Sequence, residues 1–289
     1  MTFKIGFHVS IGGGIYNSVD RAKSIGCTAF QIFTRNPRVW EFRSISEQDV
    51  DLFKSKLEKS GIQKDSIAVH TGFLINLSAP NSELYQKSTD YLTNELIRCS
   101  QLGIENLIID LGSHLGVGVE NGINQLINSC GQAADDSKTA FKNNRNVTVL
   151  LQNGYGQKNA MGNSIEELRD ILDKLPKTGY GICLDTCHAF QSGYDLTTND
   201  ACERFIDKFD YIVGLNTVKF IHLNDSKKEL GMHIDRHEHI GQGKIGIEGI
   251  RSIINNSHLR GLPMIIQTPI DSLRNDSDNL EVVLQLRKD

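Results

Sequence analysis

Seven residues that could bind a metal ion or move a proton stand at or near the ends of short β-rich runs. They are His8, His70, Asp110, Gln152, Asp185, His222 and Gln267. Imidazole nitrogens and carboxylate oxygens are common protein ligands of zinc. One such residue at the end of a strand is as often a packing or capping residue, but seven in succession indicate a metal centre or a catalytic site.

Two local motifs add further potential ligands. Asp185-Thr-Cys-His188 places a carboxylate at the end of a run and an imidazole three residues later, so the two side chains could serve different ions of one cluster. Asp235-Arg-His237 has a different geometry. Residues i and i+2 of an extended chain project to the same side and can therefore bind one ion together.

The elements that must position these residues alternate regularly between short strands and helical segments. The predicted strands are Phe3–His8, Thr28–Thr34, Ser66–His70, Asn106–Leu111, Val147–Gln152, Tyr180–Asp185, Val218–Leu223 and Pro263–Thr268. Several are continuous apolar runs, which are typical of parallel strands covered by helices. Eight repeats predict an α/β fold, a (β/α)8 barrel, with an open doubly wound sheet as the alternative. In such a barrel the carboxyl ends of the strands converge on one face, where active sites form.

Helix signals occupy the segments between these strands. Ser44-Ile-Ser-Glu47 has the spacing of a capping box, and Gly61 is the expected stop of the helix that follows. A longer helix is expected to end near Gly103. Ser164-Ile-Glu-Glu167 predicts another helix start, with Pro176 beyond its end.

Composition limits the possible functions. The chain has 289 residues, and its 39% hydrophobic and 23% charged content is that of one globular domain, which we expect to span residues 1–289. A net charge of −4 argues against a broad polyanion-binding surface but not against a local basic patch or bound cations. No apolar run approaches the ~20 residues that cross a bilayer, and the N-terminus lacks a signal peptide. We therefore expect an intracellular protein without membrane attachment, acting as a monomer.

Longer motifs, in the same order over essentially the whole chain, resemble those of the endonuclease IV family. They are Phe7-His8-Val-Ser, Thr34-Arg-Asn-Pro-Arg-Val-Trp40, His70-Thr-Gly-Phe-Leu-Ile-Asn-Leu77, Leu111-Gly-Ser-His114, Cys183-Leu-Asp-Thr-Cys-His188-Ala-Phe, Phe220-Ile-His222-Leu-Asn-Asp-Ser-Lys227, and Asp235-Arg-His237 with Gly241-Gln-Gly-Lys-Ile-Gly246. The resemblance implies a xylose-isomerase-like TIM barrel with three zinc ions in its mouth. It also implies a DNA-repair hydrolase that cuts duplex DNA on the 5′ side of abasic sites.

The resemblance further implies roles for individual residues. His188, Asp235 and His237 correspond to the ligands of one zinc, Asp185 and His222 to part of a second site, and His70 to part of the third. Arg38, Trp40, Phe73 and Leu74 correspond to segments that enter the minor groove and fill the gap left by the extruded nucleotide. Such contacts recover the few kcal/mol that kinking and flipping cost.

Three positions depart from the family pattern. Asp110 replaces a histidine ligand, and Gln152 and Gln267 replace glutamates at the catalytic positions. A neutral amide bridges two cations poorly, and it cannot deprotonate a nucleophile. Only the site of His188, Asp235 and His237 is complete, so we expect one well-occupied Zn²⁺, reduced or lost cleavage, and retained binding of abasic DNA.

Two alternatives follow from the same residues. The first is an active nuclease with a changed metal set, for instance Mn²⁺ at the site with Asp110. The second is a sugar isomerase or epimerase on a similar divalent-metal barrel. That enzyme would have a closed pocket for a small polyol and no use for Arg38, Trp40 and Phe73 at the rim.

Overall fold

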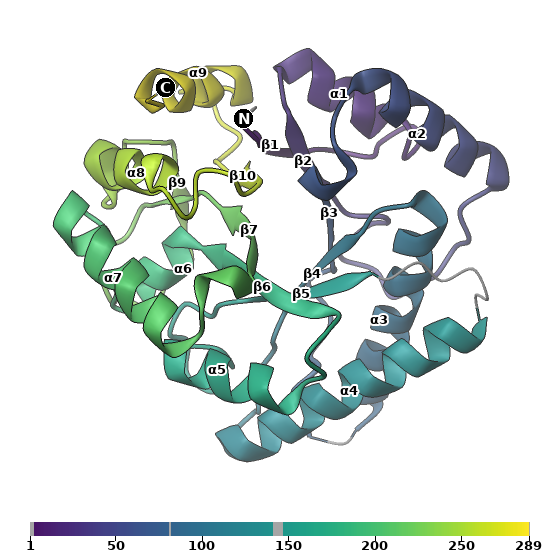
Figure 1. The fold of residues 1–289 in the computed structure, drawn as a ribbon. Coiled ribbons are helices and arrows are strands. Elements are labelled where there is room, and N and C mark those ends of the chain that lie inside the picture. Colours follow the sequence, from purple (N-terminus) through teal and green to yellow (C-terminus); the bar gives the residue numbers. More distant parts are fainter. Residues whose placement is uncertain (1–2, 81, 141–146, 289) are drawn as a thin grey trace.

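Eight parallel strands close into a barrel in the computed structural model, which describes residues 3–80, 82–140 and 147–288 (Figure 1). The strand order is β1-β10-β7-β6-β5-β4-β3-β2. The bounds are β1 Ile5–His8, β2 Ala29–Ile32, β3 Ile67–His70, β4 Asn106–Asp110, β5 Thr148–Gln152, β6 Tyr180–Asp185, β7 Val218–His222 and β10 Met264–Ile266. Each lies within one predicted strand. The closed barrel confirms the predicted fold and excludes the open doubly wound sheet.

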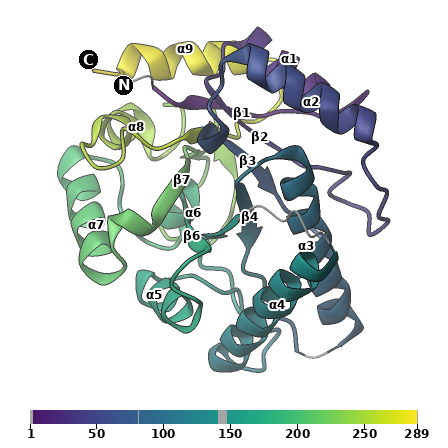
Figure 2. The same ribbon diagram turned by 45° about the vertical axis from the view of Figure 1, so that its right-hand side comes forward.

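Helices surround this barrel, and the end of α9 lies close to the start of the described chain, where the Arg287 guanidinium stacks on the Phe3 ring (Figures 1 and 2). The α-helices are α1 Asn17–Ile25, α2 Glu47–Ser60, α3 Glu83–Leu102, α4 Val119–Ala140, α5 Ile165–Lys174, α6 Thr186–Gln191, α7 Asn199–Ile212, α8 Gly246–Asn255 and α9 Asp276–Leu286. Short 3-10 helices cover Lys64–Ser66 and Leu215–Thr217, and β8 (Asp225–Ser226) pairs antiparallel with β9 (His237–Glu238). None of the helices in the described ranges is long and apolar enough to cross a membrane.

The helix boundaries differ from the prediction at one start. α2 is capped by Ser46, whose hydroxyl accepts from the Asp49 N–H, so the predicted capping box of Ser44 and Glu47 is wrong by two residues. The chain stays in the preceding loop at this point, where the Arg43 carbonyl accepts a hydrogen bond from Arg98. The predicted glycine stops are confirmed, since both adopt the left-handed conformation that glycine tolerates without strain.

The start of α5 is confirmed at its cap, where the Ser164 hydroxyl accepts from the Glu167 N–H. The reciprocal half of a capping box is absent there. The Glu167 carboxylate instead accepts from the N–H groups of Gly162 and Asn163, which lie before the cap. Ser164 alone therefore caps the helix, and Glu167 stabilises the loop that precedes it.

Two layers of side chains fill the barrel interior. The lower layer is an apolar plug of Ala29, Ala68, Ile108, Leu150, Cys183, Phe220 and Ile265. Strand β1 contributes Gly6 to this layer instead of an apolar side chain, because a Cβ atom there would lie 1.7 Å from the Ala29 carbonyl oxygen. Alternate residues of a strand face the same side, so the residue two positions further on each strand also points inward.

Those eight residues form the upper layer, which we call the polar ring. Its members are His8, Gln31, His70, Asp110, Gln152, Asp185, His222 and Gln267. Neighbouring strands hold some of them in direct register, as with His8 and Gln31, and Asp185 and His222. The barrel thus carries chemistry-bearing side chains one pleat above an apolar floor.

Candidate metal centre

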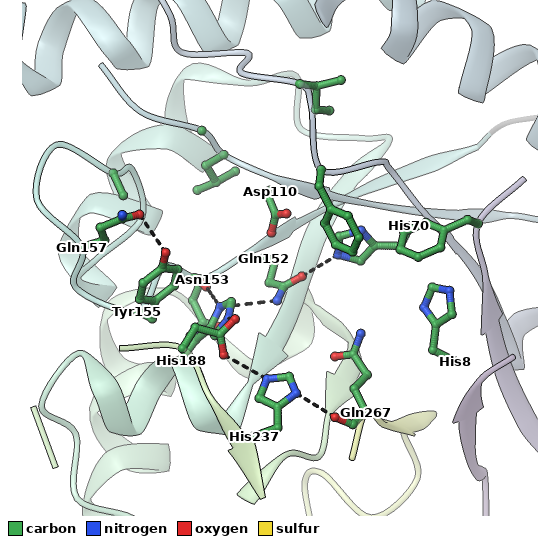
Figure 3. A pocket seen from close by; sticks show the side chains of 18 of the residues that line it. His8, His70, Asp110, Gln152, Asn153, Tyr155, Gln157, His188, His237 and Gln267 are labelled. Carbon is green, nitrogen blue, oxygen red and sulfur yellow. Dashed lines mark hydrogen bonds and ion pairs between the residues drawn. The ribbon is translucent and has the colours of Figure 1, made fainter. Parts of the chain in front are cut away.

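Five members of the polar ring line a cavity of about 690 Å³ at the mouth of the barrel (Figure 3). They are His8, His70, Asp110, Gln152 and Gln267. The first four end strands β1, β3, β4 and β5, and Gln267 follows β10 directly. The barrel brings them together because its strand ends converge. Convergence of the predicted ligands on one cavity agrees with a shared site.

The cluster of His188, Asp235 and His237 lies at one side of this cavity. The Asp235 carboxylate stands between the two imidazoles, with Oδ2 3.4 Å from His188 Nε2 and Oδ1 3.1 Å from His237 Nε2. His188 belongs to α6, and His237 begins β9. Asp235 and His237 therefore do project to the same side, as their spacing predicted.

Asp185 connects this cluster to the polar ring. It caps α6 by accepting the His188 N–H at 3.0 Å, and one of its oxygens lies within 4.8 Å of ligand nitrogens of His188 and His237. Its Oδ2 is also 3.5 Å from His222 Nδ1. The sequence left open whether Asp185 and His188 serve different ions, but their ligand atoms are close enough to contact the same one.

Backbone carbonyls orient three of the histidines. The Nδ1 atoms of His70, His188 and His237 lie 2.7–2.8 Å from the carbonyl oxygens of Thr71, Asn153 and Gln267. Each Nδ1–H donates to its carbonyl, so that Nε2 of His188 and His237 faces Asp235 and Nε2 of His70 faces Gln152. This is the arrangement by which proteins fix the tautomer of metal-binding histidines.

Two buried imidazole nitrogens lack a hydrogen-bond partner within the described part of the chain. They are His222 Nδ1 and His237 Nε2, and each faces a carboxylate oxygen. A buried polar atom without a partner costs roughly 1–3 kcal/mol. A divalent cation between nitrogen and carboxylate would satisfy both, so the donor set fits zinc.

The electrostatics also favour a cation here. Burial disfavours the charged forms of Asp185, Asp235 and His188, but their mutual attraction outweighs it. The pKa values of both carboxyl groups are lowered well below their usual range, and the pKa of His188 is raised to about 10. The two carboxylates therefore remain ionised, and the protonated His188 imidazole supplies the positive charge beside them, a place that a bound cation could take.

The side chains of Gln152 (Figure 3) and Gln267 are held by hydrogen bonds within the site. Gln152 Oε1 lies 2.9 Å from His70 Nε2, and its amide nitrogen donates to Asp185 Oδ2 at 3.3 Å. Gln267 Oε1 accepts from the Asn224 side chain at 3.1 Å, and that amide also donates to Asp185. The amide groups thus occupy positions between potential ligands.

The other members of the ring differ in charge. Asp110 is half-buried and pairs in register with Gln152, so it supplies a carboxylate beside an amide. Burial, together with His70 and His222, lowers the pKa of His8 to about 3. His8 is therefore a neutral imidazole at neutral pH. Sequence reasoning did not identify Gln31 or Asn224 as members of the site.

A second cavity of about 890 Å³ adjoins the first and shares Phe33 and Phe73 with it. Arg21, Arg35 and Arg38 line this cavity together with Asp276, and Arg35 is buried in an ion pair with Glu95. The two cavities form one depression that is open toward the rim loops, rather than a closed pocket.

The predicted DNA-binding residues lie in two loops joined by the hydrogen bond from Phe73 N to the Pro37 carbonyl. Phe73 is 58% exposed, and Arg38 is also exposed. Leu74 is half-buried, as is Trp40, which packs edge-on against Tyr91. The structure therefore brings Arg38 and Phe73 to the cavity and turns Trp40 toward the core.

Comparisons with known proteins agree with this geometry. The chain matches the family described as "Xylose isomerase-like TIM barrel" over residues 19–287. "Probable endonuclease 4" of Cenarchaeum symbiosum (strain A) is 45% identical over 284 residues, which is 98% of this chain and 99% of the relative. The chain belongs to the endonuclease IV family. Another relative in this family, "Probable endonuclease 4" of Nitrosopumilus maritimus (strain SCM1), is 43% identical over 96% of this chain and 97% of its own length.

Solved structures lead to the same family. Endonuclease IV from Thermus thermophilus superposes with a TM-score of 0.85 and 32% identity, over 98% of each chain. A D-tagatose 3-epimerase-like protein reaches a TM-score of 0.70 at 17% identity and shares the fold alone. Members of the endonuclease IV family act on abasic DNA with zinc, and Asp185, His188 and His237 of this chain form a group that could hold a metal ion.

Proposed function

We propose that this chain binds duplex DNA at abasic sites and holds one zinc ion at His188, Asp235 and His237, with weak phosphodiester cleavage. The observation that carries the proposal is the contrast between this cluster, where a carboxylate faces two imidazoles, and the amides of Gln152 and Gln267. The amides add no negative charge to hold further cations.

The open depression supports DNA rather than a small polyol as the ligand. The second cavity is lined by the exposed Arg38, and the exposed Phe73 ring lines both cavities. An arginine suits the phosphate-rich groove, and an exposed aromatic ring can stack where a base is missing. We extend the proposal to Leu74, which follows Phe73 in the same loop. Trp40 would support that loop through Tyr91 rather than enter the groove.

Zinc at this centre would polarise the phosphate and lower the pKa of a bound water. Whether the bound water can attack the phosphate depends on side chains that could take its proton. Gln152 and Gln267 cannot take a proton from an attacking water, since an amide is not a base in this pH range. Asp110, Asp185 and His70 would have an incomplete set of metal ligands around them, and the two carboxylates would repel the phosphate wherever no cation stands between.

The decisive test compares the unaltered chain with the triple variant Asp110→His, Gln152→Glu and Gln267→Glu. Cleavage of a duplex oligonucleotide with one abasic site is measured with zinc present. Each restored carboxylate should contribute on the order of 10²-fold, so the variant should cut orders of magnitude faster. Gln157→Glu is a matched control, because it adds a carboxylate at an exposed position of the same cavity. Equal rates for the unaltered and triple-variant chains would contradict the proposal.

Metal analysis tests the other half of the proposal. We expect about one tightly held zinc per unaltered chain and more in the triple variant. Three tightly held zincs in the unaltered chain would contradict it. Cleavage that is restored by Mn²⁺ but not by Zn²⁺, and lost in Asp110→Asn, would support a changed metal set instead, since oxygen ligands suit manganese.

The remaining parts of the proposal concern the whole chain. We propose that residues 1–289 form one domain that acts as a monomer inside the cell, where its DNA ligand is found. Light scattering of the free protein and of its complex with an abasic duplex tests the monomer. A dimer in both states would contradict it.

A further inference from the structure

Gln31 is the one member of the polar ring that comes from β2, and it belongs to none of the predicted ligand sets. Its side chain is completely buried in the barrel. The amide oxygen lies 2.8 Å from His222 Nε2, and the amide nitrogen lies 2.8 Å from His8 Nδ1. Gln31 thus joins two imidazoles across the barrel mouth.

His222 differs from the other candidate ligands in how it is oriented. His70, His188 and His237 are each fixed at Nδ1 by a backbone carbonyl and present Nε2. His222 is reversed. Its Nε2 meets the side chain of Gln31, and its buried Nδ1, 3.5 Å from Asp185 Oδ2, has no hydrogen-bond partner among the described residues.

We propose that Gln31 is the positioning residue of His222. The amide oxygen accepts the Nε2–H, which keeps the proton off Nδ1 and leaves that nitrogen as a metal ligand beside Asp185. The inference rests on the metal centre of the proposed function. It adds a residue that tunes one ligand without touching the metal itself.

The contact with His8 is consistent with this orientation of the amide when the His8 proton is on Nε2. In that tautomer His8 Nδ1 accepts the Gln31 N–H, and the amide oxygen is directed to the other side, toward His222. If the amide were reversed, its nitrogen would face His222 Nε2 and the ring proton would move to Nδ1. That proton would then lie against Asp185, in the place where a cation would bind.

A purely structural role accounts poorly for this contact. β2 and β7 are not neighbours in the barrel, because β1 and β10 lie between them. The hydrogen bond therefore crosses the interior and adds nothing to the pairing of adjacent strands. An apolar side chain would fill the same space but would leave His222 free to adopt either tautomer.

The test measures zinc affinity by competition with a chromophoric chelator. Gln31→Met keeps the length of the side chain and removes the acceptor, and zinc should bind 10–100-fold more weakly, as on loss of other outer-shell partners. Gln31→Glu restores an acceptor for Nε2–H and should bind zinc at least as well as the unaltered chain. Asn106→Leu is the control. It removes a buried amide that donates to the Ile67 carbonyl at the start of β4, at the other end of the strand from Asp110. It should lower the stability of the fold without weakening zinc binding.

A spectroscopic measurement separates this inference from the proposed function. Nitrogen chemical shifts of the metal-free chain should place the His222 proton on Nε2, and Gln31→Met should move it to Nδ1. A proton on Nδ1 in the unaltered chain would overturn the inference, as would unchanged zinc affinity in Gln31→Met. If the unaltered chain binds no zinc, the proposed centre fails, and the tautomer still decides whether Gln31 positions His222.

Discussion

The loop cluster and the polar ring reach the same cavity by different structural routes. The loop cluster comprises His188, Asp235 and His237, which lie in the segments after β6 and around the start of β9, and it keeps an ionic pairing of one carboxylate with two imidazoles. The ring is set by strand pleating, and three of its eight members are neutral amides. The comparison teaches that the barrel fixes where a ligand stands, while the residue type alone decides whether that position carries charge.

The largest effect should come from removing the charge of the loop cluster. Asp235→Asn leaves two imidazoles facing a neutral amide, and zinc affinity should fall by more than about 100-fold, the upper end for outer-shell losses. Competition with a chelator measures it. The matched control is Asp271→Asn, which breaks a His–Asp pair of 3.0 Å with His239 outside the cluster. Equal losses in both variants would show that the cluster is not the metal site.

A smaller effect is expected from adding charge to the ring. Gln152→Glu replaces an N–H donor by a carboxylate opposite Asp185 Oδ2, 3.3 Å from the original nitrogen. Without metal, the free energy of unfolding should fall by about 1–3 kcal/mol, and zinc should restore it because a bound ion stabilises the folded chain. Urea denaturation with and without zinc measures both values, with Gln157→Glu as the exposed control. Loss of stability that zinc does not restore would argue against a metal position between these side chains.

The smallest effect should come from the rim, which touches neither part of the centre. Phe73→Ala should weaken binding to an abasic duplex by about 1 kcal/mol, the lower end for a base stacked on an aromatic ring, with zinc affinity unchanged. Fluorescence anisotropy compares abasic with undamaged duplex. Tyr211→Ala, at a 92% exposed ring on α7, is the control. An equal effect of both variants would remove Phe73 from the DNA-binding surface.

The sequence was sufficient for the barrel and for seven members of the ring, because residue types that bind metals stand out at the ends of apolar strands. Gln31 was missed for two reasons. It has no ionisable group, and the predicted strand Thr28–Thr34 placed it in the middle of a strand that ends at Ile32. The signal that identifies it is its position two residues after the inward-facing Ala29, which requires knowing which side of each strand faces inward.

The contacts made by the segments outside the strands could not be predicted from the sequence for a different reason. Asp185 and His188 are close because Asp185 caps α6 and accepts the His188 N–H, and a cap of this kind depends on where the helix begins. Trp40 was predicted at the rim from its motif, but its contact with Tyr91 comes from α3, which lies far along the chain. Interactions of this kind depend on tertiary packing, which local spacing does not encode.

The apolar plug beneath the ring has a consequence for how this fold can change over time. Its seven side chains and Gly6 pack the interior at this level of the barrel. The eight positions above them can therefore be polar. Exchanges such as glutamate for glutamine alter the ligand chemistry of a position while the floor keeps its backbone in place. A barrel of this design can therefore gain or lose a metal ligand through one substitution and keep its fold, at a cost in stability such as the one expected of Gln152→Glu.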